Sequence, residues 1–443
     1  MEAAVASEVE QFLTLARGRL AAEGWGSLEW VEAGLREALL KDGRRLLEEL
    51  LNDPALPVAG DASRAGEKCT QGVERQVGSV FGVLTLRRSY YYAAGTGGGR
   101  YPLDEALGLI QGCTPMLARL MTRAGAQSGF VGAAEDLRVY GGLQVEGRQI
   151  HRLLQHTGPA MHQAWAELPA ARPTSPLPVL YVSVDGTGVP MVPEALIGRR
   201  GKQPDGSAKT REIKLGCVFT QHTIDAQGRP LRDPDSTTYL CGLEVAEDFG
   251  GRLRREAFRR GMGQSQRTVF LGDGAAWVWE IGRINFPHAI AILDYFHARE
   301  HLTELVDAIL GPASPTASRR VESWKDWLWE GQVDRILRAA RRHLHRYGAV
   351  DPQEAQTQVA YFEKNRSRMR YGRFRSQGFF IGSGVVEAGC KTVVGQRAKQ
   401  SGMRWSETGV LSVLHTRCAL LGGQFDQCWE HARFRPSPHA LAA

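Results

Sequence analysis

Residues 178–187 read Pro-Val-Leu-Tyr-Val-Ser-Val-Asp-Gly-Thr, and residues 268–274 read Thr-Val-Phe-Leu-Gly-Asp-Gly. Each stretch is a short run of β-branched and apolar residues that stops at an Asp-Gly pair, which is typical of a buried strand followed by a turn. The pattern predicts that Asp185 and Asp273 lie at the carboxyl ends of two buried strands. Each aspartate alone also has a purely structural explanation, because Asp-Gly is a common turn signal.

A third acidic residue, Glu387, follows Gly382-Ser-Gly-Val-Val and begins a stretch that predicts a helix. Alone, it would be explained by an i, i+4 pair with Lys391, worth about 0.3 to 0.5 kcal/mol. Three carboxylates brought together are costly unless a cation lies between them. Oxygen ligands of this kind suit Mg²⁺ or Mn²⁺, and two such ions about 3.5 to 4 Å apart can cleave a phosphodiester. We therefore expect Asp185, Asp273 and Glu387 to be catalytic and to bind two metal ions.

The order of the expected elements around these acids is informative. It is three strands, then helix, strand, helix, strand, helix, and it resembles the order of a ribonuclease H-like α/β fold, whose first and fourth strands carry metal-binding aspartates. The expected strands span 179–184, 212–222, 237–244, 268–272 and 289–293, and the helices lie near 246–261, from Ala275 and from about Phe296.

The rest of the chain divides by its patterning into further segments. Helical spacing and a tryptophan cluster predict an all-helical insertion, and a Pro-rich stretch near 170–178 marks the preferred domain boundary. A mainly helical N-terminal region with a small β element precedes it. The predicted segments are 1–60 (helical), 61–112 (β-containing), 113–170 (helical), 178–296 with 381–422 (catalytic), 297–380 (insertion) and 423–443 (tail).

Within 113–170, two helical stretches separated by Tyr140-Gly-Gly-Leu143 have the proportions of a helix-turn-helix. On that interpretation Arg148 and Arg152 of the second helix would contact DNA. A small helical bundle with solvated basic residues explains the pattern equally well.

Composition limits the class of protein. The chain has 443 residues, 43% hydrophobic and 23% charged, as in a globular protein of two or three domains. A formal net charge of +7 allows a polyanionic partner. The basic excess is concentrated between Glu363 and Arg404, where ten basic residues stand against two acidic ones.

Neither secretion nor membrane insertion is expected. The seven cysteines form no Cys-x-x-Cys pair, which argues against a disulfide framework or a zinc ribbon. The acidic N-terminus is unlike a secretory signal, and no apolar run approaches the roughly 20 residues of a membrane helix. We therefore expect a cytoplasmic, nucleoid-associated protein.

The chain resembles the bacterial insertion-sequence transposases of the DDE type, in particular the ISKra group. The resemblance covers most of the chain. It depends on five motifs: Val184-Asp-Gly-Thr187, Phe270-Leu-Gly-Asp-Gly274, Ile292-Leu-Asp-Tyr-Phe-His297 with Glu300-His-Leu302, Gly382-Ser-Gly-Val-Val-Glu387 and Lys399-Gln-Ser-Gly-Met-Arg-Trp405.

The resemblance implies that Asp185, Asp273 and Glu387 are the family's catalytic triad. The implied reaction is hydrolysis at transposon ends, followed by attack of the freed 3′ hydroxyl on target DNA. The partners would be double-stranded DNA, namely terminal inverted repeats and target DNA, and at least a homodimer during synapsis. The residues expected to hold the DNA backbone are Lys391, Arg397, Lys399 and Arg404.

Asp294, His297 and Trp405 each have more than one interpretation. Asp294-x-x-His297 resembles an element of Mutator-type transposases, which implies a supporting role, although a buried salt bridge is an equal alternative. Trp405 could stack on a base, but core packing is the favoured interpretation. Family members often carry Cys-x-x-Cys after the aromatic strand, whereas Tyr90-Tyr-Tyr-Ala-Ala-Gly95 has no cysteine, so an N-terminal zinc knuckle is doubtful.

Three other functions compete with transposition. His297-Ala-Arg-Glu300-His301 matches H-x-x-E-H, the inverted motif of zinc peptidases, although no third ligand stands out. A DNA-binding protein without activity is disfavoured by the intact triad. A nuclease of the same fold, without transposition, remains open.

Overall fold

A computed structural model of the chain describes residues 7–24, 28–93, 98–169, 177–201, 203–204, 206–312, 314–432 and 434. The chain forms two compact units, one of Met1–Met161 with Ala432–Ala443 and the other of His162–His431. Most of the Pro-rich boundary expected near 170–178 lies outside the described residues. No helix within the described ranges is long and apolar enough to cross a membrane.

The first unit combines helices with a small antiparallel sheet. Two N-terminal helices are followed by a hairpin whose strands β1 and β2 meet at a turn that pairs Ser79 with Gly82. Gly82 has a φ of 116°, a conformation that favours glycine. The elements are α1 (Glu8–Glu23), α2 (Leu28–Leu51), β1 (Glu67–Ser79), β2 (Gly82–Ala93), β3 (Gly99–Arg100), α3 (Pro102–Ala106), α4 (Pro115–Gln127), α5 (Phe130–Gly141) and α6 (Gly147–Glu167).

The helical pair expected near Tyr140 is present as α5 and α6. Helix α5 ends at Gly142, which has a φ of 71° and serves as a left-handed cap. Helix α4 packs closely on α6, because a Cβ added at Gly125 would come within 2.6 Å of Ile150 and Leu154. Three packed helices therefore surround the turn.

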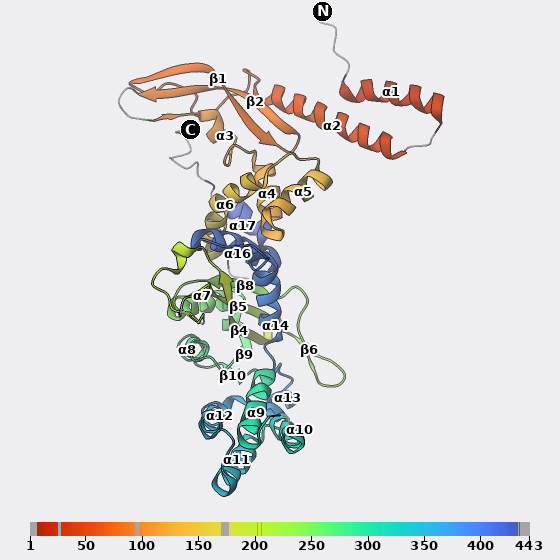
Figure 1. Cartoon of the computed structure of the whole chain (residues 1–443). Helices are drawn as coiled ribbons and strands as arrows, with labels where there is room; N and C mark the ends of the chain where they lie inside the picture. The colour runs from red at the N-terminus through yellow and green to blue at the C-terminus, as the bar shows by residue number, and fades with distance from the viewer. Residues whose placement is uncertain are drawn as a thin grey trace, which may run out of the picture. The chain divides into compact units, whose positions relative to one another are not determined.

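The second unit is built on a mixed five-stranded sheet (Figure 1). The strand order is β10-β9-β4-β5-β8, with β10, β9 and β4 parallel and with β4, β5 and β8 antiparallel. The strands are β4 (Leu177–Pro190), β5 (Thr210–Gln221), β8 (Thr238–Gly242), β9 (Ser265–Gly272) and β10 (Ile290–Leu293), with the short pair β6 (Thr223–Ile224) and β7 (Pro230–Leu231) beside them.

The five main strands, and the helices α7 (Ala246–Arg259), α8 (Ala276–Asn285) and α9 (Tyr295–Leu310), follow one another in the predicted order. Residues Val179 to Val184 of β4 are all buried, as its apolar run predicts for a central strand. The chain is therefore a mixed α/β protein around this sheet.

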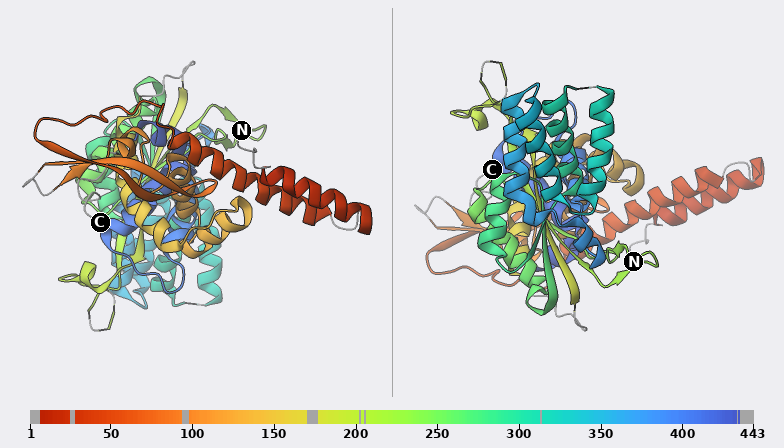
Figure 2. Two further views of the ribbon diagram at one scale, coloured as in Figure 1. Left: turned by 90° about the horizontal axis from the view of Figure 1, so that it is seen from above. Right: turned by 90° about the horizontal axis from the view of Figure 1, so that it is seen from below.

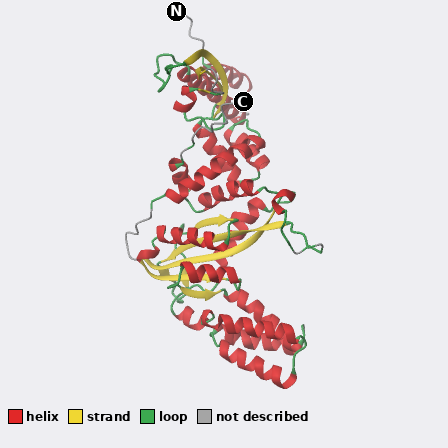
Figure 3. Cartoon of the chain, turned by 90° about the vertical axis from the view of Figure 1, so that its left-hand side faces the viewer, coloured by secondary structure: helices red, strands yellow, loops and turns green. Residues whose placement is uncertain are grey.

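Helices cover both faces of the sheet (Figure 3). A Cβ at Gly216 of β5 would contact Leu253 and Phe249 of α7, whereas the neighbouring Leu215 contacts Gly389. Successive residues of a strand point to opposite faces, so α7 and the segment of Gly389 lie on opposite sides. The second face is covered by α14 (Gly384–Gly389), a π-helical turn (Cys390–Gly395), α15 (Gln396–Ala398) and α16 (Glu407–Leu421).

The predicted helical insertion consists of helices that lie side by side (Figure 2, right). Helix α9 contacts both α10 (Pro315–Trp329) and α12 (Pro352–Asn365), and α11 (Val333–Tyr347) completes the group before the short α13 (Tyr371–Ser376). Within the tryptophan cluster, Trp324 is buried and stacks on Trp327. A last helix, α17 (Phe425–His431), follows α16.

Candidate functional site

Asp185 and Asp273 lie at the same edge of the sheet. Strands β4 and β9 are parallel neighbours, and their register pairs Val184 with Gly272, the residues immediately before the two aspartates. The expectation that Asp185 ends its strand is wrong, because β4 continues to Pro190 while paired with β5. The pairing of β4 with β9 ends at Val184 and Gly272. Both aspartates therefore stand at the carboxyl end of this parallel pair.

Asp185 lies in a partly buried, negatively charged environment. Burial raises the pKa of its carboxyl group, and the charges of Asp273 and Glu387 raise it further. Hydrogen bonds from the thiol of Cys390 and the backbone N–H of Gly186 oppose this rise in the pKa. The Gly186 nitrogen is 2.6 Å from Asp185 Oδ1. Asp185 therefore lies within electrostatic reach of both other predicted acids.

Asp273 is oriented by the turn that follows β9. Its Oδ1 accepts a hydrogen bond from the Ala275 backbone nitrogen at 2.9 Å, immediately before α8. The ring of Tyr361 from α12 covers this turn, since a Cβ added at Gly274 would lie 2.6 Å from that ring. Burial, and then the charges of Asp273 and Asp294, raise the pKa of Tyr361. The helical insertion thus contributes one wall of the site.

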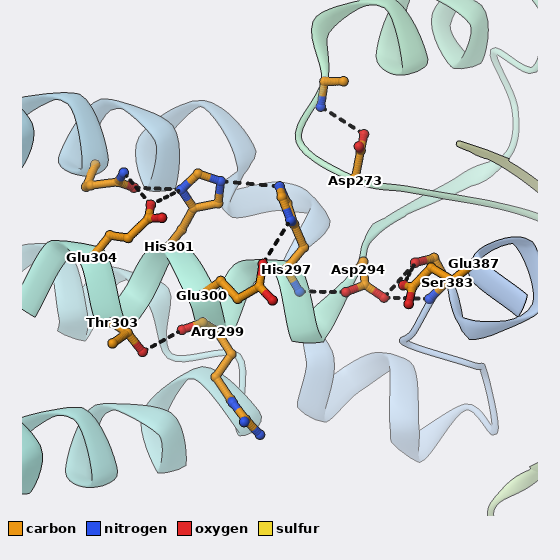
Figure 4. Close-up of polar contacts among 12 residues, drawn as sticks. Asp273, Asp294, His297, Arg299, Glu300, His301, Thr303, Glu304, Ser383 and Glu387 are labelled. Carbon is orange, nitrogen blue, oxygen red and sulfur yellow. Dashed lines mark hydrogen bonds and ion pairs between the residues drawn. The ribbon is translucent and has the colours of Figure 1, made fainter. Parts of the chain in front are cut away.

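Glu387 is exposed on the first turn of α14 and is held by Ser383. The Ser383 hydroxyl donates to Glu387 Oε1 at 2.6 Å and also lies 2.9 Å from Asp294 Oδ2, as Figure 4 shows. The backbone nitrogen of Ser383 donates to the same Oδ2 atom at 2.5 Å. Glu387 is therefore connected through one serine to the strand that precedes α9.

Asp294 serves as the N-cap of α9. It is only 1% exposed, and its Oδ1 accepts a hydrogen bond from the His297 backbone nitrogen at 2.6 Å. Its own backbone nitrogen donates to the Gly272 carbonyl at 2.8 Å, one residue before Asp273. Within the described residues Asp294 forms no ion pair. Hydrogen bonds alone therefore link Asp294 to the segments of two of the acids.

His297 and His301 form a pair on α9. Their Nε2 atoms are 3.3 Å apart, and His301 stacks on Tyr361 with ring centroids at 3.7 Å. His301 Nδ1 lies 2.8 Å from the Gln358 side-chain oxygen, and His297 Nδ1 lies 3.6 Å from Glu300. Glu300 and Glu304 lie beside these imidazoles, but the described residues contain no group of three that could hold a metal ion. The peptidase interpretation therefore gains no support.

The described residues contain no ready-made cluster of three or more His, Cys, Asp or Glu side chains that could hold a metal ion. The donor chemistry of Asp185, Asp273 and Glu387 nevertheless fits Mg²⁺ or Mn²⁺, which bind carboxylate oxygens. Burial first, and then the charges of Asp273 and Glu387, raise the pKa of Asp185, and a bound cation would oppose both effects. The donor types of the three acids therefore fit a divalent cation, although their arrangement in the described residues forms no ready-made site.

The basic residues expected at the DNA differ in their exposure. Lys391, Lys399 and Arg404 are exposed, and the Lys399 ammonium contacts the hydroxyl of Thr187, two residues beyond Asp185. Arg397, by contrast, is fully buried at 0% exposure, and its guanidinium lies 5.3 Å from the ring of Trp405. The expectation that Arg397 contacts DNA is therefore wrong for this structure.

Trp405 is also part of the core. It is 6% exposed, and its indole nitrogen donates to the Ala398 carbonyl at 3.0 Å. Packing in the core, and not stacking on a base, explains the position of the Trp405 side chain. In the first unit, Arg148 and Arg152 are both exposed on α6.

Sequence reasoning missed several residues of the site. Ser383 lies within one of the five motifs but had no expected role, and neither Cys390 nor Tyr361 was expected near the acids. Ser383 had a usable signal, since it lies four residues before Glu387, one helical turn away. Cys390 and Tyr361 reach the acids only through tertiary packing, so no local pattern could identify them.

No protein-family model matches the chain, and no curated protein matches its sequence. Among solved structures, a Drosophila P element transposase strand transfer complex aligns with 70% of this chain and 79% of its own chain. The identity is 8% and the TM-score is 0.27, a likeness too weak to carry an argument about this chain.

Proposed function

We propose that this chain is a DDE-type transposase of the insertion-sequence class, with a ribonuclease H-like catalytic domain. The proposal depends above all on one observation. Asp185 and Asp273 follow paired residues of two parallel strands, and the charges of Asp273 and Glu387 both raise the pKa of Asp185. These observations support a common site for three acids that are distant in sequence.

The order of elements supports this proposal. Strands β4, β5 and β8 precede α7, β9, α8, β10 and α9, which is the order expected for the ribonuclease H-like fold. Its first and fourth strands are β4 and β9, and these are the two that carry the aspartates. The exposed Lys391, Lys399 and Arg404, which follow the third acid in the sequence, suit a DNA backbone.

Each residue then has a role. Asp185, Asp273 and Glu387 would hold two divalent cations, which when bound activate a hydroxyl nucleophile and neutralise charge on the phosphate oxygens. Ser383 and Asp294 position Glu387 through their hydrogen bonds. Lys399, beside Thr187, would meet a backbone phosphate. The partners would be terminal inverted repeats and target DNA, bound by a homodimer or larger assembly that brings two ends together.

The proposal is tested with a labelled duplex that carries the DNA flanking this reading frame, incubated with the full chain and Mg²⁺. We expect a cut at the end of the element, and Asp185→Asn, Asp273→Asn and Glu387→Gln should each lower the cleavage rate at least about a thousandfold while retaining DNA binding. Glu212→Gln is the matched control, because this exposed acid lies over Gly186 without belonging to the triad. Its cleavage rate should be unchanged.

A second substrate separates transposase from nuclease. Pre-cut end DNA with a free 3′ hydroxyl is mixed with supercoiled plasmid, and covalent joining is measured. Joined product supports transposition, and cleavage without joining supports a nuclease of the same fold. Full cleavage by any of the three acid variants would exclude that residue from the catalytic set.

A further inference from the structure

A cleft of about 660 Å³ opens at the end of the sheet opposite to the three acids. It is lined by residues 265–268 at the start of β9 and 288–290 at the start of β10, together with side chains of α7 and α13. A smaller hollow of about 330 Å³ adjoins it and shares Ile290, Arg373 and Gln377. From Thr268 to Asp273 the chain rises about 16 Å at the usual spacing of a strand, so the cleft is separate from the acids.

The lining of the cleft and of the adjoining hollow is basic and contains no acidic residue. Most of its arginines are exposed, and they come from α7, from β9 and from the segment that leads into α13. The basic residues are Arg254, Arg267, His288, Arg368, Arg370 and Arg373. Such a concentration of guanidinium groups is suited to a chain of phosphates and not to an isolated carboxylate.

An exposed aromatic ring adds a second kind of contact. Phe258 lines the same cleft and is 48% exposed, so its ring is accessible from the cleft. The guanidinium of Arg254 lies 5.5 Å from the centre of its ring. Basic side chains that follow a backbone, beside an aromatic ring that can stack on a base, are characteristic of single-strand binding.

We propose that this cleft binds a single-stranded segment of nucleic acid, with phosphates on Arg254, Arg267 and Arg373 and a base against Phe258. The cleft is too small to enclose a duplex, whereas an extended strand can continue from it into the adjoining hollow past Arg373. In the proposed reaction such a strand is a displaced or flanking single strand of the DNA. The inference deepens the proposed function by adding a second contact with the DNA, remote from the acids.

The test measures fluorescence anisotropy of a short labelled oligothymidylate with the full chain in EDTA. Arg254→Ala with Arg373→Ala should weaken binding at least tenfold and reduce the salt slope by roughly 0.7 for each phosphate that is no longer neutralised. Phe258→Ala should weaken it at least about fivefold. Arg255→Ala is the matched control, since Arg255 is exposed on the same helix but does not line the cleft. It should bind as the unaltered chain does.

Several results would overturn the inference. Equal losses of affinity in Arg254→Ala and Arg255→Ala would show that binding depends on net charge and not on this cleft. Unchanged affinity in the cleft variants would exclude the site. Competition by pyrophosphate as effective as that by unlabelled oligonucleotide would indicate a site for small anions. A duplex of equal length that binds more tightly, with the same dependence on Arg254, would indicate a duplex site.

Melting temperatures confirm that each variant is folded. Because binding is measured without divalent ions, cleft variants that bind normally contradict this inference alone. Acid variants that cleave normally contradict the proposed function alone.

Discussion

Asp294 Oδ2 accepts a hydrogen bond from the Ser383 backbone nitrogen at 2.5 Å, and the Ser383 hydroxyl oxygen lies 2.9 Å from the same atom. The two residues are 89 positions apart, and Asp294 ends the loop after β10 while Ser383 begins the turn into α14. Because Ser383 also donates to Glu387, this interaction fixes where the third acid stands relative to the sheet. The helical insertion leaves and rejoins the sheet at this point.

Asp294→Asn should lower both the free energy of unfolding and the rate of cleavage. An amide has one accepting oxygen where the carboxylate has two, so the variant loses either the cap of α9 or the hydrogen bond from the Ser383 backbone nitrogen. We expect a loss of about 1 to 3 kcal/mol in the free energy of unfolding. Cleavage of end DNA should fall at least tenfold, because Glu387 loses its anchor, while DNA binding persists.

The control for this variant is Asp351→Asn. Asp351 caps α12 by accepting from the Glu354 nitrogen at 3.0 Å and has no link to the acids. It should lower stability by about 1 kcal/mol and leave cleavage intact. Equal effects of the two substitutions on cleavage would mean that Asp294 acts only as a cap.

Gly274→Ala should disturb the wall formed by Tyr361. The added Cβ would lie 2.6 Å from the ring of Tyr361, so the ring or the turn after Asp273 must move. We expect a loss of about 1 to 3 kcal/mol and reduced cleavage. Tyr361→Ala in the same chain should remove the clash, so thermal unfolding should show a double-mutant loss smaller than the sum of the single losses. Additive losses would contradict this packing of Tyr361 on the turn.

Arg397→Leu and Lys399→Ala test the corrected assignment of the basic residues. Arg397 is fully buried, and its substitution should lower the free energy of unfolding by about 1 to 3 kcal/mol without a specific effect on DNA affinity. Lys399 is exposed, so its removal should weaken DNA binding and reduce the salt slope by about 0.9 while leaving the melting temperature unchanged. The reverse outcome would restore Arg397 as a DNA-binding residue.

A histidine pair should make the second unit sensitive to mild acid. The rings of His162 and His415 stack at 3.7 Å, and burial together with the charge of Arg252 lowers the pKa of His162 to about 4 and that of His415 well below its usual value. In the unfolded chain these histidines bind protons below about pH 6.5, whereas in the folded chain His162 binds its proton only near pH 4. The contribution of this pair to the free energy of unfolding is therefore fully present above pH 6.5 and is lost as the pH falls toward 4.

Urea unfolding at pH 7.5 and 5.0 measures this effect. His162 alone should account for a loss of about 2 kcal/mol between the two values. The loss should be smaller in a chain that carries His162→Gln and His415→Gln. An undiminished loss in that variant would assign the acid sensitivity to other groups.

The local features of the sheet could be predicted from sequence, and the connections between distant segments could not. Apolar runs before Asp185 and Asp273 predicted β4 and β9 because a central strand must be buried on both faces. Strand β1 could not be located within the β-containing segment 61–112, because its charged residues stand in adjacent pairs and no apolar run marks it. The hydrogen bonds between Asp294 and Ser383 were also beyond prediction, because they join segments separated by the whole helical insertion.

The helix expected from Glu387 shows where local patterns mislead. Its spacing predicts one continuous helix, but residues Cys390–Gly395 form a π-helical turn between α14 and α15. Arg397, in the α15 segment that follows, is fully buried. Its charge had suggested an exposed side chain that contacts DNA. Arg397 lies 5.3 Å from the ring of Trp405, and local helical spacing does not reveal such a packing contact.

The central claim is that Asp185, Asp273 and Glu387 form one divalent-cation site, and a titration of Mn²⁺ followed by electron paramagnetic resonance tests it most directly. The unaltered chain and Glu212→Gln should bind Mn²⁺ with the same affinity, whereas Asp185→Asn, Asp273→Asn and Glu387→Gln should each weaken it at least tenfold. Equal Mn²⁺ binding by all five proteins would contradict the account, because the three acids would then not share a cation.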